Sequence, residues 1–146
     1  MNQKIIAYTD GGSRGNPGPA ALGVAFVDEK GHVTKQYGEP LGVRTNNEAE
    51  YEAIIYALKK AKQLFGKDKT KTMQMEIRMD SELACRQLNH EYKVENENIV
   101  PLFLKVWNLM IDFGEVSFVH VPRERNKDAD RMVNEALDRG TQKSLL

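Results

Sequence analysis

Cysteine and long apolar runs are nearly absent from this sequence. Its single cysteine, Cys85, has no second thiol with which to form a disulfide within the chain. No apolar stretch approaches the roughly 20 residues that a membrane-spanning helix needs, and the N-terminus shows no charged and then apolar leader with a small-residue cleavage site. These absences exclude a disulfide scaffold and predict a protein of the reducing cytoplasm, without a membrane segment.

A surplus of charge of either sign is also absent. The 21 lysines and arginines balance the 21 aspartates and glutamates, so no overall field draws the protein towards polyanions or membranes. Any affinity for nucleic acid must therefore come from a local patch. The length of 146 residues suits one core, and we expect a single domain over residues 1–146.

Hydrophobic periodicity predicts nine elements in the order βββαβααβα. The strands are expected at 4–9, 21–27, 32–37, 73–79 and 116–121, and the helices at 45–65, 80–88, 99–113 and 126–140. Thr45 and Glu48 have the spacing of a capping box, and Asn126 is placed to cap the last helix. This order predicts an α/β protein in which a mixed sheet carries helices on both faces.

One glutamate lies on the apolar side of the 45–65 helix. A helical wheel places Glu50 in the middle of the apolar stripe, whereas Glu48 and Glu52 fall on the opposite side. The stripe consists of Ala53, Ile54, Ala57, Leu58, Ala61, Leu64 and Phe65. A carboxylate there is costly unless it is paired, protonated or bound to a metal. The alternative, a residue at the edge of the stripe that reaches solvent, is equally open.

Three aspartates stand at comparable places. Asp10 and Asp80 each follow a predicted strand at its carboxyl end, where open α/β sheets bind ligands, and Asp130 lies beside the apolar stripe of the last helix. Each has an ordinary explanation when it is taken singly. Asp10 can be a turn residue, Asp80 a helix cap, and Asp130 a complement to the helix dipole. If they converge with Glu50, their repulsion requires a counter-ion, and Mg²⁺ or Mn²⁺ prefers such ligands. Two ions about 4 Å apart would suit phosphodiester hydrolysis.

Four motifs lie far apart in the sequence. They are Tyr8-Thr9-Asp10-Gly11-Gly12-Ser13 with Gly15-Asn16-Pro17-Gly18, Thr45-Asn46-Asn47-Glu48-Ala49-Glu50, Met79-Asp80-Ser81 and Asn126-Lys127-Asp128-Ala129-Asp130. Together they resemble type 1 ribonuclease H over nearly the whole chain. The resemblance implies a ribonuclease H-like fold with a five-stranded mixed sheet of order 3-2-1-4-5. It also implies an endonuclease that hydrolyses the RNA strand of RNA/DNA hybrids and leaves 5′-phosphate and 3′-hydroxyl ends.

The same resemblance implies roles for particular residues. Asp10, Glu50, Asp80 and Asp130 would form a catalytic quartet that holds two Mg²⁺ or Mn²⁺ ions when substrate is bound. Asp10 would bridge both ions, Asp130 would help to hold the ion that activates water, and Glu50 and Asp80 would hold the ion at the leaving oxygen. The implied substrate contacts are Gly11, Gly12, Asn16, Thr45, Asn46 and Asn47.

The sequence departs from the family pattern in two places. Many members carry a histidine in the loop before the last helix, whereas this chain has Arg123, as in a branch that resembles archaeal and some bacterial enzymes. Because arginine stays protonated, its role would be electrostatic, in phosphate release or substrate positioning. His120 falls in a β pattern and is expected to be structural. A basic, tryptophan-containing protrusion is missing between Leu88 and Ile99, so we expect modest substrate affinity.

Two other classes of protein compete with a nuclease. A nucleotide-binding enzyme would use the glycine-rich loop after the first strand, but this loop leads into a β pattern rather than into a helix N-terminus. A catalytically silent binding module is disfavoured by the complete acidic quartet. The expected partner is therefore an RNA/DNA hybrid, with double-stranded RNA as a further candidate, and the expected state is a monomer.

Overall fold

A computed structural model describes residues 3–145 of the chain, with side chains described for residues 3–140. The strands are β1 (Lys4–Ser13), β2 (Gly18–Val27), β3 (Val33–Arg44), β4 (Gln74–Met79) and β5 (Glu115–His120). The helices are α1 (Asn46–Phe65), α2 (Lys67–Thr70), α3 (Glu82–Leu88), α4 (Val100–Met110), a 3-10 turn η1 (Arg123–Arg125) and α5 (Lys127–Leu145).

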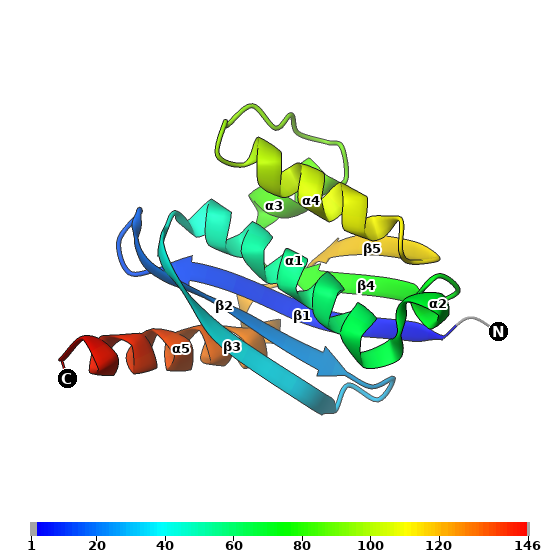
Figure 1. Cartoon of the computed structure of the whole chain (residues 1–146), viewed down its shortest axis with the longest axis horizontal. Helices are drawn as coiled ribbons and strands as arrows, with labels where there is room; N and C mark the ends of the chain where they lie inside the picture. The colour runs from blue at the N-terminus through cyan, green and yellow to red at the C-terminus, as the bar shows by residue number, and fades with distance from the viewer. Residues whose placement is uncertain (1–2, 146) are drawn as a thin grey trace.

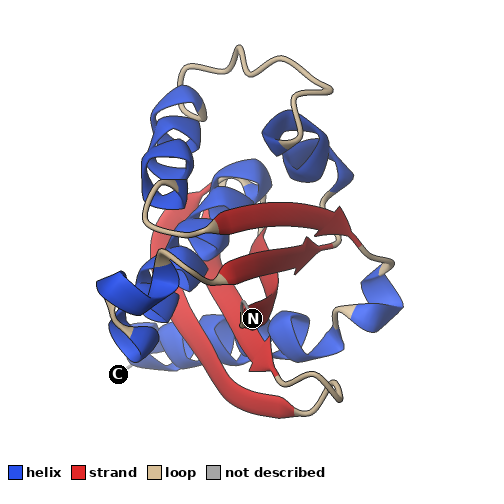
Figure 2. Ribbon diagram, turned by 90° about the vertical axis from the view of Figure 1, so that its right-hand side faces the viewer, coloured by secondary structure: helices blue, strands red, loops and turns tan. Residues whose placement is uncertain are grey.

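The strands form one mixed sheet of order β3-β2-β1-β4-β5. The β1–β2 and β2–β3 pairs are antiparallel, whereas β4 pairs in parallel with both β1 and β5. Helices α1, α3 and α4 lie on one face, and α5 crosses β2 and β3 on the other (Figures 1 and 2). The predicted fold, sheet order and two-faced arrangement are confirmed, and β1 lies at the centre.

Two apolar layers hold the sheet between the helices. The larger layer lies under α1 and α4, where Ile54, Leu58 and Ile77 are fully buried. The smaller one joins Val133 and Ala136 of α5 to β2. Burial of one such aliphatic side chain contributes about 1.5–3 kcal/mol, so both faces of the sheet contribute to stability. Within residues 3–145, no helix is both long and apolar enough to span a membrane.

The start of α1 is fixed by its cap and by a glycine on β1. Glu48 N donates to Thr45 Oγ1 at 3.1 Å, and Thr45 N donates to Glu48 Oε1 at 2.8 Å, which confirms the predicted capping box. A Cβ on Gly11 would lie 2.1 Å from the carbonyl carbon of Ala49. Only glycine permits this close approach, which brings the first turn of α1, and with it Glu50, against β1.

Several predicted boundaries are wrong. The first strand continues to Ser13 because Gly11 and Gly12 pair with β2, so the predicted loop shrinks to residues 14–17. The third strand reaches Arg44 instead of residue 37. Helix α5 continues through Gly140, because a glycine inside a helix costs only about 1 kcal/mol. The short elements α2 and η1 were not predicted, since they lack a distinctive periodicity.

Candidate metal centre

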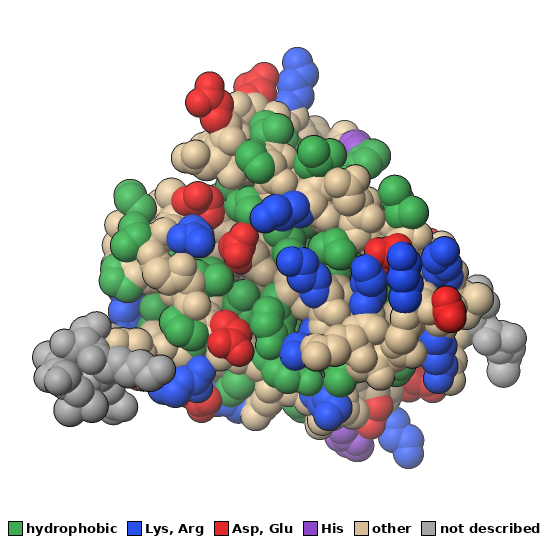
Figure 3. Space-filling model, viewed as in Figure 1, with side chains coloured by type: hydrophobic (Ala, Val, Ile, Leu, Met, Phe, Trp, Pro, Cys, Tyr) green, Lys and Arg blue, Asp and Glu red, His purple; other side chains and the backbone are tan. Residues whose placement is uncertain are grey.

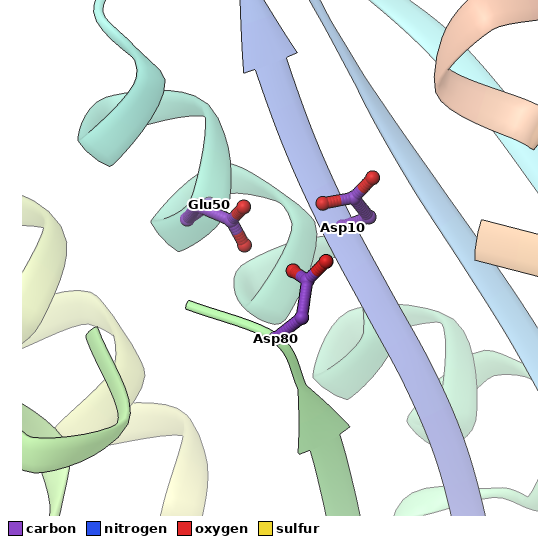
Figure 4. A group of neighbouring side chains, drawn as sticks. All are labelled: Asp10, Glu50 and Asp80. Atoms are coloured by element: carbon purple, nitrogen blue, oxygen red, sulfur yellow. The ribbon is translucent and has the colours of Figure 1, made fainter. Parts of the chain in front are cut away.

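Three carboxylates meet where β1 and β4 run side by side. Thr9 pairs with Met79 at the end of the parallel ladder, so the next residues, Asp10 and Asp80, are neighbours. Glu50 approaches them from the first turns of α1, as Figure 4 shows. One carboxylate oxygen from each of the three residues lies within 4.8 Å of the other two. Residues 40 and 70 positions apart in the chain thus share one small volume.

Two of these carboxylates are removed from solvent. Asp10 is 7% exposed and Glu50 is 8% exposed, so the alternative in which Glu50 reaches solvent is wrong. Tyr51, the neighbour of Glu50, is fully buried and donates from its hydroxyl to Gln87 Oε1 at 2.8 Å. This hydrogen bond ties α1 to α3, the helix that follows Asp80, and so restricts the separation of Glu50 from Asp80.

Burial and like charge both disfavour ionisation at this place. Burial, followed by the negative charge of Asp80, raises the pKa of Asp10 to about 8. Burial and the charges of Asp10 and Asp80 hold the pKa of Glu50 well above its usual range. Glu50 Oε2 is buried and has no hydrogen-bond partner within the described residues. A cation would relieve each of these unfavourable features at once.

The donor set fits a hard divalent cation. All three converging ligands are carboxylates, which suit Mg²⁺, Mn²⁺ or Ca²⁺ rather than the softer metals that select thiolate. The unpartnered Glu50 oxygen provides a ligand position that no described side chain, over residues 3–140, occupies. The chemistry of this cluster is therefore that of a group that could hold a divalent metal ion.

Asp130 lies beside the cluster rather than within it. It lines the same cavity, of about 680 Å³, and its charge further raises the pKa of Asp10, yet its oxygens fall outside the group of three. Its helix is attached to β1 by the buried Asn126, whose Nδ2 donates to Thr9 O at 2.9 Å. The predicted capping role of this asparagine side chain is wrong, because the amide faces β1 instead of α5.

Most of the predicted substrate contacts line the same cavity. Gly11, Gly12, Asn16, Asn46 and Asn47 all lie on its wall. Thr45 does not line it, and its hydroxyl oxygen accepts the α1 capping bond. The five lining residues therefore form one continuous surface next to the carboxylates.

Arg123 and His120, the two basic residues considered before the last helix, lie in different places. Arg123, on η1, lines the cavity that holds the carboxylates. His120 lines a different hollow, beside Cys85 and Phe118, so it lies away from the carboxylate cluster.

The asparagines at the start of α1 are oriented by hydrogen bonds. Asn46 Oδ1 accepts from Ser13 N at 2.9 Å and from Ser13 Oγ at 3.1 Å. Asn16 Oδ1 accepts from Asn46 N at 3.0 Å. Because their oxygens are engaged, the NH₂ groups of Asn16 and Asn46 are the atoms left to meet a ligand.

Sequence reasoning missed several residues of the cavity wall. Ser81, Leu83, Val133, Asn134 and Leu137 also line it. For Asn134 a signal existed, since it follows Asp130 by four residues and so lies on the same face of α5. Arg14, a basic loop residue that the sequence made a candidate for contacts with a nucleic-acid backbone, also lines the cavity.

Known proteins share both the sequence and the fold of this chain. A family model described as reverse transcriptase-like matches residues 8–136. A ribonuclease HI of Halobacterium salinarum is 40% identical over 135 residues, which cover 92% of this chain and 65% of that protein. The bifunctional protein Rv2228c of Mycobacterium tuberculosis is 34% identical over 140 residues, which cover 95% of this chain and 37% of that protein. The chain thus spans about two fifths to two thirds of these two relatives.

Solved structures agree closely with this arrangement. The crystal structure of LC11-RNase H1 in complex with an RNA/DNA hybrid has a TM-score of 0.88 at 45% identity, covering 94% of this chain and 99% of that chain. RNase H1 from the halophilic archaeon Halobacterium salinarum gives 0.83 at 40% identity, covering 92% and 98%. The fold and the site define a ribonuclease H-like protein. The chain belongs to the type 1 ribonuclease H family, as its sequence motifs predicted.

Proposed function

We propose that this protein hydrolyses the RNA strand of RNA/DNA hybrids, using divalent metal ions held by Asp10, Glu50, Asp80 and Asp130. The observation that carries the proposal is the convergence of three carboxylates within 4.8 Å, one of them with a buried, unpartnered oxygen. Cleavage would leave 5′-phosphate and 3′-hydroxyl ends. Membership of a family in which LC11-RNase H1 has been crystallised with a hybrid supports this choice of substrate.

Asp10 is the residue that can serve two Mg²⁺ or Mn²⁺ ions. The negative charges of both Asp80 and Asp130 act on it, and one of its carboxylate oxygens lies within 4.8 Å of those of Glu50 and Asp80. When bound, the ions would supply Lewis acidity for the attacking water and for the leaving oxygen. Asp130 would then hold the water side, whereas Glu50 and Asp80 would hold the leaving-group side.

Substrate recognition follows from the groups that face the cavity. The NH₂ groups of Asn16 and Asn46 can donate to the 2′-oxygen of a ribose or to base atoms of the minor groove. Asn47 also lines the cavity, and an amide side chain can donate to or accept from a 2′-hydroxyl. Gly11 and Gly12 leave room beside these amides for the backbone of the strand.

Thr45 and Arg123 would contact phosphates. Thr45 Oγ1 accepts the capping bond from Glu48 N, so its hydroxyl hydrogen is still available for a phosphate of the DNA strand. Arg123 is exposed on the cavity wall and stays charged at every physiological pH. It would attract the phosphate next to the cut and assist the departure of the product.

We further propose that the chain acts as a single, monomeric, cytoplasmic domain and that double-stranded RNA is a second substrate. One sheet with helices on both faces supports the single domain, and the buried, unpaired Cys85 suits a reducing compartment. Double-stranded RNA presents 2′-hydroxyls on both strands to the same asparagines.

The proposal is tested with end-labelled RNA/DNA hybrid, DNA duplex and RNA duplex of one sequence, each incubated with Mg²⁺, Mn²⁺ or EDTA. We expect cuts in the RNA of the hybrid only when a metal is present, none in the DNA duplex, and weaker cuts in the RNA duplex. The Asp10→Asn variant serves as the control for contaminating nucleases. A well-folded wild-type protein that leaves the hybrid intact with either metal would refute the proposal.

A further inference from the structure

An arginine reaches into the cavity from the loop after β1. The backbone of Arg14 is held in place, because its N–H donates to Pro19 O at 2.8 Å and a Cβ on Gly18 would lie only 2.3 Å from Arg14 O. Its guanidinium extends to α5, where Nη2 donates to Asp138 Oδ1 at 2.6 Å. The backbone of Arg14 is thus held in place, and its side chain connects two segments that are far apart in the sequence.

The partner of Arg14 stands on the same helix face as the metal-site aspartate. Asp130, Asn134 and Asp138 follow one another at intervals of four residues, and such residues lie above one another on a helix. Arg14 and Asn134 line the carboxylate cavity. Eight residues of α-helix span about 12 Å, and because Leu137 also lines the cavity, the cavity extends along α5 towards Asp138.

The Arg14–Asp138 pair is weak and can be exchanged. The two side chains are 46% and 64% exposed, and solvent screens exposed ion pairs strongly. Within the described residues the guanidinium makes no second hydrogen bond, so most of its five N–H donors are free. A phosphate accepts two parallel N–H bonds from one arginine and binds it more strongly than a singly bonded, exposed carboxylate does.

We propose that Arg14 binds a backbone phosphate of the strand being cut, and that Asp138 competes with this phosphate for the guanidinium. This inference rests on the proposed function. Asp138 follows Asp130 by about 12 Å along α5, so the phosphate that Arg14 binds lies a few nucleotides from the scissile phosphate. Asp138 therefore weakens substrate binding, and its removal frees Arg14.

The test compares Arg14→Ala, Asp138→Asn and the double variant, with Asp128→Asn as the matched control. Asp128 is a partly exposed aspartate of α5 that also pairs with an arginine, Arg131, at 3.3 Å, but it does not line the cavity. Its substitution makes the same change in net charge. The Kd for a fluorescent RNA/DNA hybrid is measured by anisotropy in an Asp10→Asn background, over a series of salt concentrations.

We expect Asp138→Asn to tighten Kd about two- to five-fold, the scale of an exposed ion pair, and Arg14→Ala to weaken it about three- to ten-fold. Loss of one phosphate contact should lower the slope of log Kd against log salt by about 0.9. In the Arg14→Ala background, Asp138→Asn should have little effect. The same variants in the active enzyme should change KM rather than kcat.

Two results would overturn the inference while the proposed function stands. One is a hybrid-cleaving protein in which Asp138→Asn behaves like Asp128→Asn. The other is an equal effect of Asp138→Asn with and without Arg14, which would indicate general charge repulsion. A wild-type protein that neither binds nor cuts the hybrid would overturn the proposed function, and this inference with it.

Discussion

Strands β1 and β4 carry two groups of polar side chains that differ in how their charges are balanced. In the first group, before the carboxyl ends of the strands, opposite charges meet. Lys4 Nζ lies 2.8 Å from Glu76 Oε1, Arg78 Nε donates to Glu76 Oε2 at 2.6 Å, and Arg78 Nη1 donates to Tyr8 Oη at 2.7 Å. Burial alone would raise the pKa of Glu76, but its hydrogen bonds and the two cations lower it.

The second group contains only negative charges. Asp10 lies within β1, two residues after Tyr8, and Asp80 directly follows β4. Both meet Glu50, and the pKa of Asp10 rises to about 8. Both groups use carboxylates at similar positions of the same two strands. The first stabilises the fold, whereas the second costs stability, which indicates a place kept for a ligand. Lysine and arginine gather elsewhere on the surface, at the right of Figure 3, over the C-terminal half of α1 and over α2.

The largest effect is expected at Asp10. Asp10→Asn should lower hybrid cleavage at least about 10²–10³-fold, the scale for loss of one group that stabilises a transition state. Because it also removes like-charge repulsion, the variant should unfold about 3–10 °C higher than the wild type in EDTA. Cleavage assays and thermal unfolding in EDTA measure the two changes. Full cleavage activity of the variant would show that Asp10 is not part of the catalytic site.

The two glutamates at the start of α1 offer an internal comparison. Glu50→Gln should reduce turnover at least about 100-fold while leaving stability in EDTA equal or higher. Glu48→Gln should retain turnover and cost about 0.5–1 kcal/mol, because it weakens the capping box seen at Thr45. Steady-state kinetics measure the turnover of both variants, and urea unfolding measures their stability. The opposite pattern of effects would exchange the roles of Glu48 and Glu50.

Arg123 tests whether a cation on the cavity wall acts in turnover. Arg123→Ala should lower kcat about ten-fold, as expected for the loss of one charge-assisted hydrogen bond. The free energy of unfolding should change by less than about 0.5 kcal/mol, because the side chain is exposed. Single-turnover and steady-state rates, compared with urea unfolding, measure both. An unchanged kcat would show that Arg123 is a solvated surface residue without a role in turnover.

The smallest effect is a difference of sign in the pH dependence of stability. The pKa of Asp10 is raised in the folded state. Its contribution to the free energy of unfolding is therefore fully present below about pH 4 and is lost as the pH rises through about 8. The pKa of Glu76 is lowered in the folded state. Its contribution to the free energy of unfolding is therefore present when the pH is above the usual pKa of a glutamate, and it is lost in acid. In EDTA, Asp10→Asn should therefore flatten the decline in stability between pH 5 and 8.

Glu76→Gln is the matched change in the paired group. It should cost about 1 kcal/mol at neutral pH, because two partly exposed cations lose their partner, and this cost should vanish in acid. Hybrid cleavage should stay within about two-fold of the wild type. Urea unfolding at several pH values checks both predictions. A profile of the same shape for Asp10→Asn and Glu76→Gln would contradict the contrast between the two groups.

The sequence was informative where one side chain sits in a local pattern. The alternation around Ile77, the capping box of Thr45 and the stripe position of Glu50 each predicted a feature of the structure. Strand order needed more than periodicity, because the pairing of β1 with β4 joins residues about 70 positions apart. The family motifs supplied this order.

Other features depend on contacts that no local pattern encodes. The amide of Asn126 faces Thr9 instead of capping α5, and the guanidinium of Arg14 meets Asp138, 124 positions away. An asparagine before a helix and an arginine in a loop look the same in sequence whichever partner they find. The close packing of β1 against α1 and α5 determines these partners.

The most direct test of the central claim is thermal unfolding of wild type, Asp10→Asn and Glu76→Gln during titration with Mn²⁺ or Mg²⁺. If the buried carboxylates form a metal site, binding to the folded state should raise the Tm of wild type and Glu76→Gln with increasing metal. Asp10→Asn should show a much smaller rise. A wild-type Tm that does not respond to either metal, or an equal response in Asp10→Asn, would contradict this account.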